Sequence, residues 1–329
     1  MSLIGLEELR AAQQRIAGVA VRTPLMPAPW AAQGERALWL KPEGLQPTGA
    51  FKIRGAYNRL AALTEAERAR GVVAQSSGNH AQAVAYAAQL LGIKAVIVMP
   101  DVSPAVKVEN TRSFGAEVFL VGAGERDSLP AELAEKHGYV WVPPYDDPYI
   151  IAGQGTVGLE IAEDAPDELD TVLVPVSGGG LISGTAAALK LACPGVRVIG
   201  VEPELAADAQ ASFRAGERLS WSTDLTYRTI ADGLRTPSVG VLPFEHIQAY
   251  VDDIVTVSEQ QIRDTVALLA RRGRLVAEPS GAVAAAAYFH CAAELEGRVF
   301  GAVVSGGNIE PSLLAELLAA APHPAGEAP

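Results

Sequence analysis

Short, almost continuously apolar runs alternate with longer helical patterns from residue 71 onward. The runs predict strands at residues 72–75, 95–99, 118–121, 139–142, 171–176, 197–201, 254–257 and 299–304. Helices are expected to end near residues 91 and 192 and to cover residues 104–114, 156–163, 259–271 and 282–293. Pro130 interrupts a further helical pattern before residue 139. Apolar runs without polar alternation are typical of a parallel sheet covered by helices on both faces.

The strand and helix pattern restarts near residue 150, which predicts two lobes. We expect an α/β fold in which two lobes, each an open, mostly parallel twisted sheet flanked by helices, face each other across a cleft. Residues 1–68 and 147–320 form the predicted large domain, and residues 69–146 form a small inserted α/β domain. Residues 321–329 are rich in Pro and Gly and are expected to be a flexible tail. Residues 216–240, the longest irregular stretch, are expected to be functional.

The composition favours a protein that acts on small molecules. Apolar residues make up 49% of the chain and charged residues 19%, which supports a sizeable core and excludes general disorder. A net charge of −12 argues against binding to nucleic acid or to an anionic membrane, since both require basic surface. No apolar run approaches the ~18 residues of a membrane span. Residues 1–10 lack the order of a signal peptide and Cys193 and Cys291 lack disulfide spacing, so a cytoplasmic location is expected.

Three small-residue turns follow predicted strands, at residues 76–80, 177–180 and 305–308. Ligands of open parallel sheets bind beyond the carboxyl ends of the strands, where such turns meet helix N-termini. Gly178, Gly179 and Gly180 allow backbone N–H groups to converge at the start of a helix, which suits a phosphate. The alternative is a tight turn chosen for packing, and neither a P-loop nor a dinucleotide fingerprint is present.

Lys52 differs in its setting from four of the other five lysines. It follows Gly49, Ala50 and Phe51, an apolar stretch that would exclude water from the amine and lower its pKa. An amine with a lowered pKa is what Schiff-base chemistry requires. Four lysines stand in amphipathic or strand-edge contexts and are expected to be solvated: Lys94, Lys107, Lys136 and Lys190.

Residues 76–80 read Ser-Ser-Gly-Asn-His between a predicted strand and a predicted helix. Small hydroxyls and exposed amides at a helix N-terminus bind carboxylate or phosphate groups. The alternatives are a simple N-cap role for Asn79 and a purely structural role for His80.

Taken together and in this order, residues 41–56, 76–80 and 177–180 resemble the fold-type II pyridoxal-phosphate enzymes, specifically the threonine/serine dehydratase and serine racemase group. The resemblance runs from about residue 6 to residue 318 and includes residues 92–100, 152–156, 202–203, 231–233, 278–282 and 305–308. It implies a tryptophan synthase β-like fold with the cofactor in the cleft.

The resemblance implies cofactor contacts at matching positions. Lys52 would form the Schiff base with pyridoxal 5′-phosphate and act as the base at the substrate Cα, Phe51 would lie against the ring, and Asn79 would bond the phenolic oxygen. Ser305 would contact the pyridine nitrogen, where a neutral hydroxyl gives a weaker electron sink that suits elimination. The phosphate would be held by Gly178, Gly179, Gly180 and Leu181.

Substrate and metal contacts follow from the same resemblance. The loop that captures the substrate carboxylate would contain Ser76, Ser77, Gly78 and His80. Ser77 also matches the serine that acts as an acid in racemase-like members. A Mg²⁺ or Ca²⁺ site of those members matches Glu202, the carbonyl of Ala206 and Asp208, although ordinary carboxylates at a helix start are the alternative.

The implied function is that of an ammonia-lyase (dehydratase), which converts L-threonine, L-serine or both to a 2-oxo acid and ammonia by β-elimination of water. Two alternatives within the family stay open: a serine racemase, and a dehydratase for a bulkier substrate such as phenylserine or 3-hydroxyaspartate. A third is a non-catalytic amino-acid-sensing protein. The expected partners are a small β-hydroxy amino acid and further copies of the chain, in a homodimer or a higher homo-oligomer.

Overall fold

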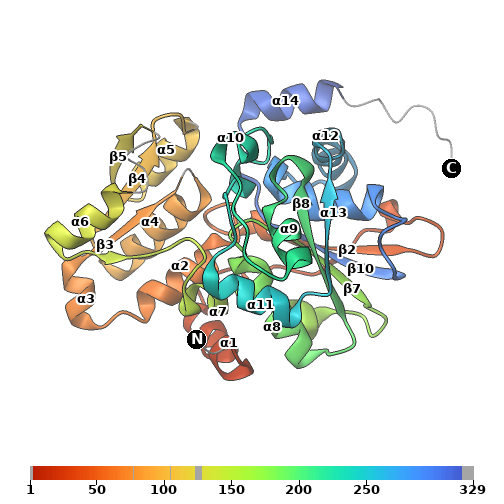
Figure 1. Cartoon of the computed structure of the whole chain (residues 1–329), viewed down its shortest axis with the longest axis horizontal. Coiled ribbons are helices and arrows are strands. Elements are labelled where there is room, and N and C mark those ends of the chain that lie inside the picture. The colour runs from red at the N-terminus through yellow and green to blue at the C-terminus, as the bar shows by residue number, and fades with distance from the viewer. Residues whose placement is uncertain (1–2, 77, 104, 123–127, 321–329) are drawn as a thin grey trace.

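The strands form two sheets, and the computed structural model describes residues 3–76, 78–103, 105–122 and 128–320 (Figure 1). Within these residues, a six-stranded sheet has the order β1 (Met26–Pro27), β2 (Ala37–Pro42), β10 (Val299–Val304), β7 (Thr171–Pro175), β8 (Arg197–Pro203) and β9 (Asp253–Val257). A four-stranded sheet has the order β5 (Glu117–Val121), β4 (Ala95–Pro100), β3 (Val72–Gln75) and β6 (Val140–Trp141). All neighbouring strands are parallel except β1 and β2. The predicted α/β architecture with mostly parallel sheets is confirmed.

Helices cover both sheets. Around the six-stranded sheet lie α1 (Leu6–Ile16), α7 (Pro148–Asp164), α8 (Gly180–Ala192), α9 (Asp208–Ala215), α11 (Val241–Tyr250), α12 (Glu259–Leu268), α13 (Pro279–His290) and α14 (Pro311–Ala320). Around the four-stranded sheet lie α3 (Glu65–Arg70), α4 (Asn79–Leu91), α5 (Ala105–Ser113) and α6 (Leu129–His137). Two helices, α2 (Lys52–Ala61) and α10 (Thr223–Thr226), lie between the two groups in Figure 1.

The central strands of the six-stranded sheet are mostly apolar, without polar alternation, because both faces of the sheet are covered. In β7, Val172 and Val174 pack into the core that contains residues of α7 and α8. Leu173, between them, packs into the core on the other face, which contains residues of α12 and α13. Alternate side chains of a strand point to opposite faces, so a strand buried on both sides shows no polar alternation.

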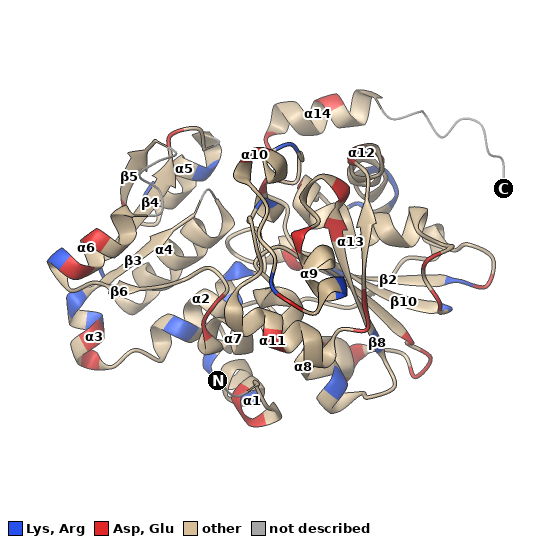
Figure 2. Ribbon diagram, in the orientation of Figure 1, with Lys and Arg blue, Asp and Glu red and all other residues tan. Residues whose placement is uncertain are grey.

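The four-stranded lobe is built around α4, which carries no charged residue (Figure 2). Its alanines pack with Val72, Ala74 and Ile97 of the sheet, and Ile53 and Leu60 of α2 belong to the same core. Acidic and basic residues lie instead on the outer helices α3 and α6 (Figure 2). The helix that begins with Lys52 is therefore held by the small lobe as well as the large one.

Two helices differ from the sequence predictions. Pro130 does not break α6, because it lies in the first turn, where no intrahelical N–H bond is lost. Helix α7 begins at Pro148 rather than near residue 156, since the Asp147 carboxylate caps it by accepting from the N–H groups of Tyr149 (2.8 Å) and Ile150 (3.0 Å).

The glycines of α7, which weaken the sequence signal for a helix, serve close packing. A Cβ atom at Gly153 would lie 2.6 Å from the Cα atom of Gly55 in α2.

Elements before residue 71 have no counterpart among the sequence predictions. The domain limits at residues 68/69 and 146/147 stay a prediction, and the predicted tail at 321–329 lies outside the described residues.

Candidate functional site

The carboxyl ends of β3, β7 and β10 border one cavity of about 260 Å³. The three turns that follow these strands all contribute residues to its lining. The structure brings eleven of the sequence-predicted site residues to this cavity: Phe51, Lys52, Ser76, Gly78, Asn79, His80, Gly178, Gly179, Gly180, Leu181 and Ser305.

Lys52 is the first residue of α2, and its amine faces the cavity. The Nζ atom donates to the carbonyl oxygen of Pro144 at 2.9 Å and lies 5.1 Å from the centre of the Phe51 ring. No carboxylate among the described residues forms an ion pair with it. Burial therefore lowers the pKa of Lys52 to about 8.

The glycine turn at residues 178–180 leads directly into α8. Gly179 has a φ of +91°, a left-handed conformation that favours glycine, and it is the N-cap of the helix. A Cβ atom at Gly178 would lie 2.1 Å from Tyr145 Cδ1, so this position also has no room for a side chain. The first N–H groups of a helix have no intrahelical partner, and they give this end of the cavity a positive potential.

The loop at residues 76–80 ends at the first turn of α4. The Ser76 hydroxyl accepts from the Gly78 N–H at 3.1 Å. His80 is buried and its Nε2 lies 3.0 Å from the carbonyl oxygen of Val142, which only accepts, so Nε2 carries the proton. Burial and the nearby Lys52 lower the pKa of His80 to about 3, so the ring is neutral. Ser77 lies outside the described residues, and its predicted roles stay predictions.

Asn79 is fixed from both sides of its amide group. Asn308 Nδ2 donates to the carbonyl oxygen of Thr48 (2.8 Å) and also to Asn79 Oδ1 (2.9 Å). The Nδ2 group of Asn79 must then face the opposite side, where it donates to Glu278 Oε1. One amide hydrogen is engaged in this way, and the other stays available to a ligand in the cavity.

Lys107, Asp232 and Glu278 form a second feature of the cavity, which we call the Lys107 cluster. Lys107 Nζ lies 2.5 Å from Asp232 Oδ2 and 3.4 Å from Glu278 Oε2. Lys107 is only 4% exposed, so the prediction that it is a solvated surface lysine was wrong. Although burial acts to lower it, the two carboxylates raise the pKa of Lys107. Burial raises the pKa of Glu278 to about 7, with Lys107 opposing and Asp232 adding to the rise.

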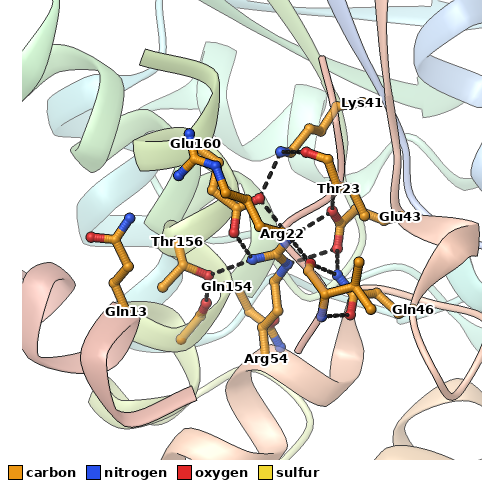
Figure 3. A network of polar contacts seen from close by, with 12 residues as sticks. Gln13, Arg22, Thr23, Lys41, Glu43, Gln46, Arg54, Gln154, Thr156 and Glu160 are labelled. Atoms are coloured by element: carbon orange, nitrogen blue, oxygen red, sulfur yellow. Dashed lines mark hydrogen bonds and ion pairs between the residues drawn. The ribbon is translucent and has the colours of Figure 1, made fainter. Parts of the chain in front are cut away.

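A buried polar network holds α2 against α7 (Figure 3). We call its four charged members, Lys41, Glu43, Arg54 and Glu160, the Arg54 network. The Arg54 guanidinium makes two hydrogen bonds to Glu43 (2.7 and 2.9 Å) and two to Glu160 (2.6 and 2.8 Å). Lys41 Nζ adds a bond of 2.6 Å to Glu160. Since Arg54 is in the first turn of α2, the network fixes the helix that begins with Lys52.

The three predicted metal ligands lie together at the end of β8, away from the cavity lining. Glu202 is fully buried and accepts from the N–H groups of Ala209 (3.1 Å) and Gln210 (2.7 Å), so it caps α9. Burial and the charge of Asp208 raise the pKa of Glu202, and burial raises the pKa of Asp208 to about 7. Within the described residues, no three His, Cys, Asp or Glu side chains converge as metal ligands.

Several lining residues were not singled out in the sequence, and eight of them come from residues 216–240: Thr223, Tyr227, Asp232, Gly233, Leu234, Arg235, Thr236 and Pro237. That stretch was expected to be functional, but nothing in it selects these side chains. Asp232 and Glu278 lie in segments that carry the family resemblance, at 231–233 and 278–282, but the resemblance assigned them no role. For Lys107, between Val106 and Val108, no sequence signal was available.

The helices in the described part of the chain are all too short or too polar to cross a membrane.

Comparison with known proteins adds to this geometry. A sequence profile of the family described as "Pyridoxal-phosphate dependent enzyme" (PALP) matches residues 16–306. The L-threonine ammonia-lyase of Thermotoga maritima is 45% identical over 96% of this chain and 78% of its own length. The L-threo-3-hydroxyaspartate ammonia-lyase of Saccharomyces cerevisiae is 42% identical over 85% of this chain and 86% of its own. The structure of maize serine racemase superimposes with a TM-score of 0.88, at 38% identity, covering 96% of this chain and 97% of that one.

Proposed function

Because this chain belongs to the family of pyridoxal-phosphate dependent enzymes, we propose that it is an ammonia-lyase that converts a small β-hydroxy amino acid, L-threonine or L-serine, to a 2-oxo acid and ammonia. Water leaves in the β-elimination and is taken up again when the resulting imine is hydrolysed. The observation that carries the proposal is the Lys52 amine, which shares one cavity with the glycine turn at 178–180 and the loop at 76–80. The similarity to an L-threonine ammonia-lyase over nearly the whole chain supports this choice of reaction.

The cavity residues fit pyridoxal phosphate. The left-handed Gly179 and the N-terminus of α8 suit the phosphate, because free N–H groups point out of the helix. Ser305 follows β10 and is 5% exposed. Among the described residues, its hydroxyl makes only a long contact of 3.5 Å with the carbonyl of Ser280, so it can turn to a ring nitrogen. When bound, the cofactor supplies a carbonyl that condenses with an amine and a ring that withdraws electrons from the substrate.

Lys52 is the base in this proposal. A pKa of about 8 leaves a larger share of uncharged amine near neutral pH than an ordinary lysine has, and only the uncharged amine can take the proton from the substrate Cα. The N–H groups of the loop at 76–80 orient the substrate carboxylate at the start of α4. His80 contributes no charge to this binding, since its ring is neutral.

The substitution Lys52→Ala tests the assignment. We expect the release of 2-oxo acid and ammonia to fall by at least about 10³-fold, as for a lost acid–base group. The visible absorbance of the bound cofactor should disappear, and borohydride reduction of the wild-type enzyme should label Lys52 in a peptide map. Lys94→Ala, at an exposed lysine of the small lobe, is the control. A label on any other lysine would reject the proposal.

Arg235 favours a second candidate function, the dehydration of 3-hydroxyaspartate. Among the described residues it is the one arginine that lines the cavity, and it forms no ion pair with a described carboxylate. Its Nε and Nη2 atoms donate to the carbonyl of Thr229 (2.9 and 2.5 Å), which fixes the guanidinium. An unpaired guanidinium suits a second substrate carboxylate.

Comparison of kcat/KM for L-threonine and L-threo-3-hydroxyaspartate decides between the two candidates. If the acidic substrate is the true one, Arg235→Gln should lower its kcat/KM by roughly 10–100-fold, the effect of a lost charged hydrogen bond, and leave L-threonine nearly unchanged. Equal effects on both substrates would show that Arg235 does not determine which substrate the enzyme prefers. Chiral analysis of the same reactions reports racemisation, which Ser77→Ala should abolish if Ser77 is the acid.

Glu202, Asp208 and the carbonyl of Ala206 would hold Mg²⁺ or Ca²⁺. Asp208 Oδ2 is buried without a described partner, and two buried carboxylates near each other suit a hard cation. Millimolar Mg²⁺ should raise the Tm of the chelator-treated enzyme, since a ligand of the native state stabilises it, and Asp208→Asn should remove the effect. Identical melting curves with and without Mg²⁺ would reject the site.

A homo-oligomer and a cytoplasmic location stay part of the proposal. Light scattering of the purified enzyme would measure its mass against the 34.3 kDa of one chain. A mass of one chain at micromolar concentration would contradict the expected oligomer.

A further inference from the structure

We infer that Lys107 is a positioning residue of this site: it holds the loop of the small lobe onto Asp232 and Glu278 of the large lobe and so fixes the Asn79 amide toward the cavity. The inference rests on the proposed cofactor site and adds a part that the proposed mechanism does not use.

The first step is the place of Lys107 between the lobes. It lies on α5, beside the four-stranded sheet, whereas Asp232 and Glu278 belong to segments around the six-stranded sheet. Among the described residues, the ion pairs of Lys107 are the only ones that join residues 72–141 to the rest of the chain. At 2.5 Å the contact with Asp232 is a close, charge-assisted bond in a buried setting.

The second step is the contact between Lys107 and the loop. A Cβ atom at Gly78 would lie 2.5 Å from Lys107 Cδ and 3.2 Å from Nζ, so the lysine stem lies directly on the backbone of Gly78. Gly78 precedes Asn79, and both line the cavity. The lysine therefore touches the loop with its stem and the large lobe with its ammonium.

The third step is the Glu278 carboxylate, which joins Lys107 to Asn79. Its Oε2 faces Lys107 at 3.4 Å and its Oε1 accepts from Asn79 Nδ2. An ionised carboxylate accepts hydrogen bonds at both oxygens. By its positive charge, Lys107 therefore favours the ionised form of Glu278, which is the form that accepts from Asn79. Without Lys107, the buried Glu278 and the half-buried Asp232 would remain together without a cation, and the pKa of Glu278, already raised to about 7, would rise further. A protonated Glu278 would hold the Asn79 amide less firmly.

Lys107→Met in the holoenzyme tests the inference, with Lys94→Met as the matched control because Lys94 is an exposed ion-paired lysine of the same lobe. We expect kcat/KM for L-threonine to fall roughly 10–100-fold, mostly in kcat, as for a misplaced catalytic geometry. The affinity of the apoprotein for pyridoxal phosphate should fall several-fold, and the visible absorbance of the bound cofactor should shift. These binding and spectral readouts do not depend on which amino acid is the substrate.

Glu278→Gln, alone and combined with Lys107→Met, separates positioning from general structure. If Lys107 acts through Glu278, the double variant should lose no more kcat/KM or cofactor affinity than Lys107→Met alone. Losses that multiply, or a Lys107→Met enzyme with wild-type kinetics, affinity and spectrum, would overturn the inference. Should Lys107→Met fail to fold, Asp232→Asn keeps the test: an unchanged cofactor spectrum and kcat/KM in that variant would also overturn it.

Discussion

The Arg54 network is a buried group of ion pairs and the Lys107 cluster a largely buried one, but they balance their charges differently. The Arg54 network has two cations and two carboxylates, and Arg54 bonds each carboxylate through two N–H groups. The Lys107 cluster has one cation for two carboxylates, and one of its contacts is 3.4 Å long. No member of the Arg54 network lines the cavity, whereas all three residues of the Lys107 cluster do.

This difference changes the charge state of carboxyl groups with the same burial. Glu43 and Glu278 are 0% and 1% exposed. Although burial acts to raise it, Arg54 and Lys41 lower the pKa of Glu43, whereas burial and Asp232 raise the pKa of Glu278 to about 7. Burial alone therefore does not decide whether a carboxyl group is charged; the number and geometry of the cations around it decide. The balanced network suits a fixed scaffold, and the unbalanced cluster suits a site that a ligand or a proton can change.

The largest effect is expected for Arg54→Met. The variant would leave Glu43 and Glu160 buried without their bidentate partner, and breaking a buried pair costs about 3–5 kcal/mol of unfolding free energy. Urea unfolding measures it, with Arg22→Met as the control. Arg22 pairs with Glu163 and Asp164 at the surface, where such a change costs about 1 kcal/mol or less. Equal losses in the two variants would mean that the network is no more important than a surface ion pair.

The same substitution in both clusters sharpens the comparison. Glu43→Gln should destabilise the protein by about 3 kcal/mol, because Arg54 loses a charged partner inside the core. Glu278→Gln should cost about 1 kcal/mol or less at pH 7.5, because the cluster keeps one cation and one carboxylate. Both values come from urea unfolding under one set of conditions. A larger loss for Glu278→Gln than for Glu43→Gln would reverse the interpretation.

The smallest effect is expected in the pH dependence of the Glu278→Gln variant. The pKa of Glu278 is higher in the folded protein than the ordinary value near 4.5, so the folded state holds the proton more tightly and this group costs stability as the pH rises from about 4.5 to about 7. The Tm of the variant relative to wild type should therefore increase between pH 5 and pH 8. A constant difference across this range would show that Glu278 does not titrate within it.

Local patterns predicted much of this molecule because they depend on neighbours in the chain. The strands β3, β4, β7 and β8 were found from apolar runs, since each is buried on both faces. The glycine turn at 178–180 and the apolar setting of Lys52 pointed to the cavity before the fold was known. Helix α7 began earlier than predicted, because its glycines reflect contact with Gly55 of another helix.

The sequence by itself determined the class of fold and the turns that border the cavity, because buried strands and glycine-rich turns are visible in short stretches of sequence. It also predicted Lys52 as the reactive lysine from its apolar flank. Only the tertiary structure decided what Lys107 does. Its carboxylate partners stand more than a hundred residues away in the chain, and its neighbours in sequence are those of an ordinary surface lysine. An ion pair is stronger where the surrounding fold excludes water, because the local dielectric constant is then low. No short stretch of sequence specifies that exclusion.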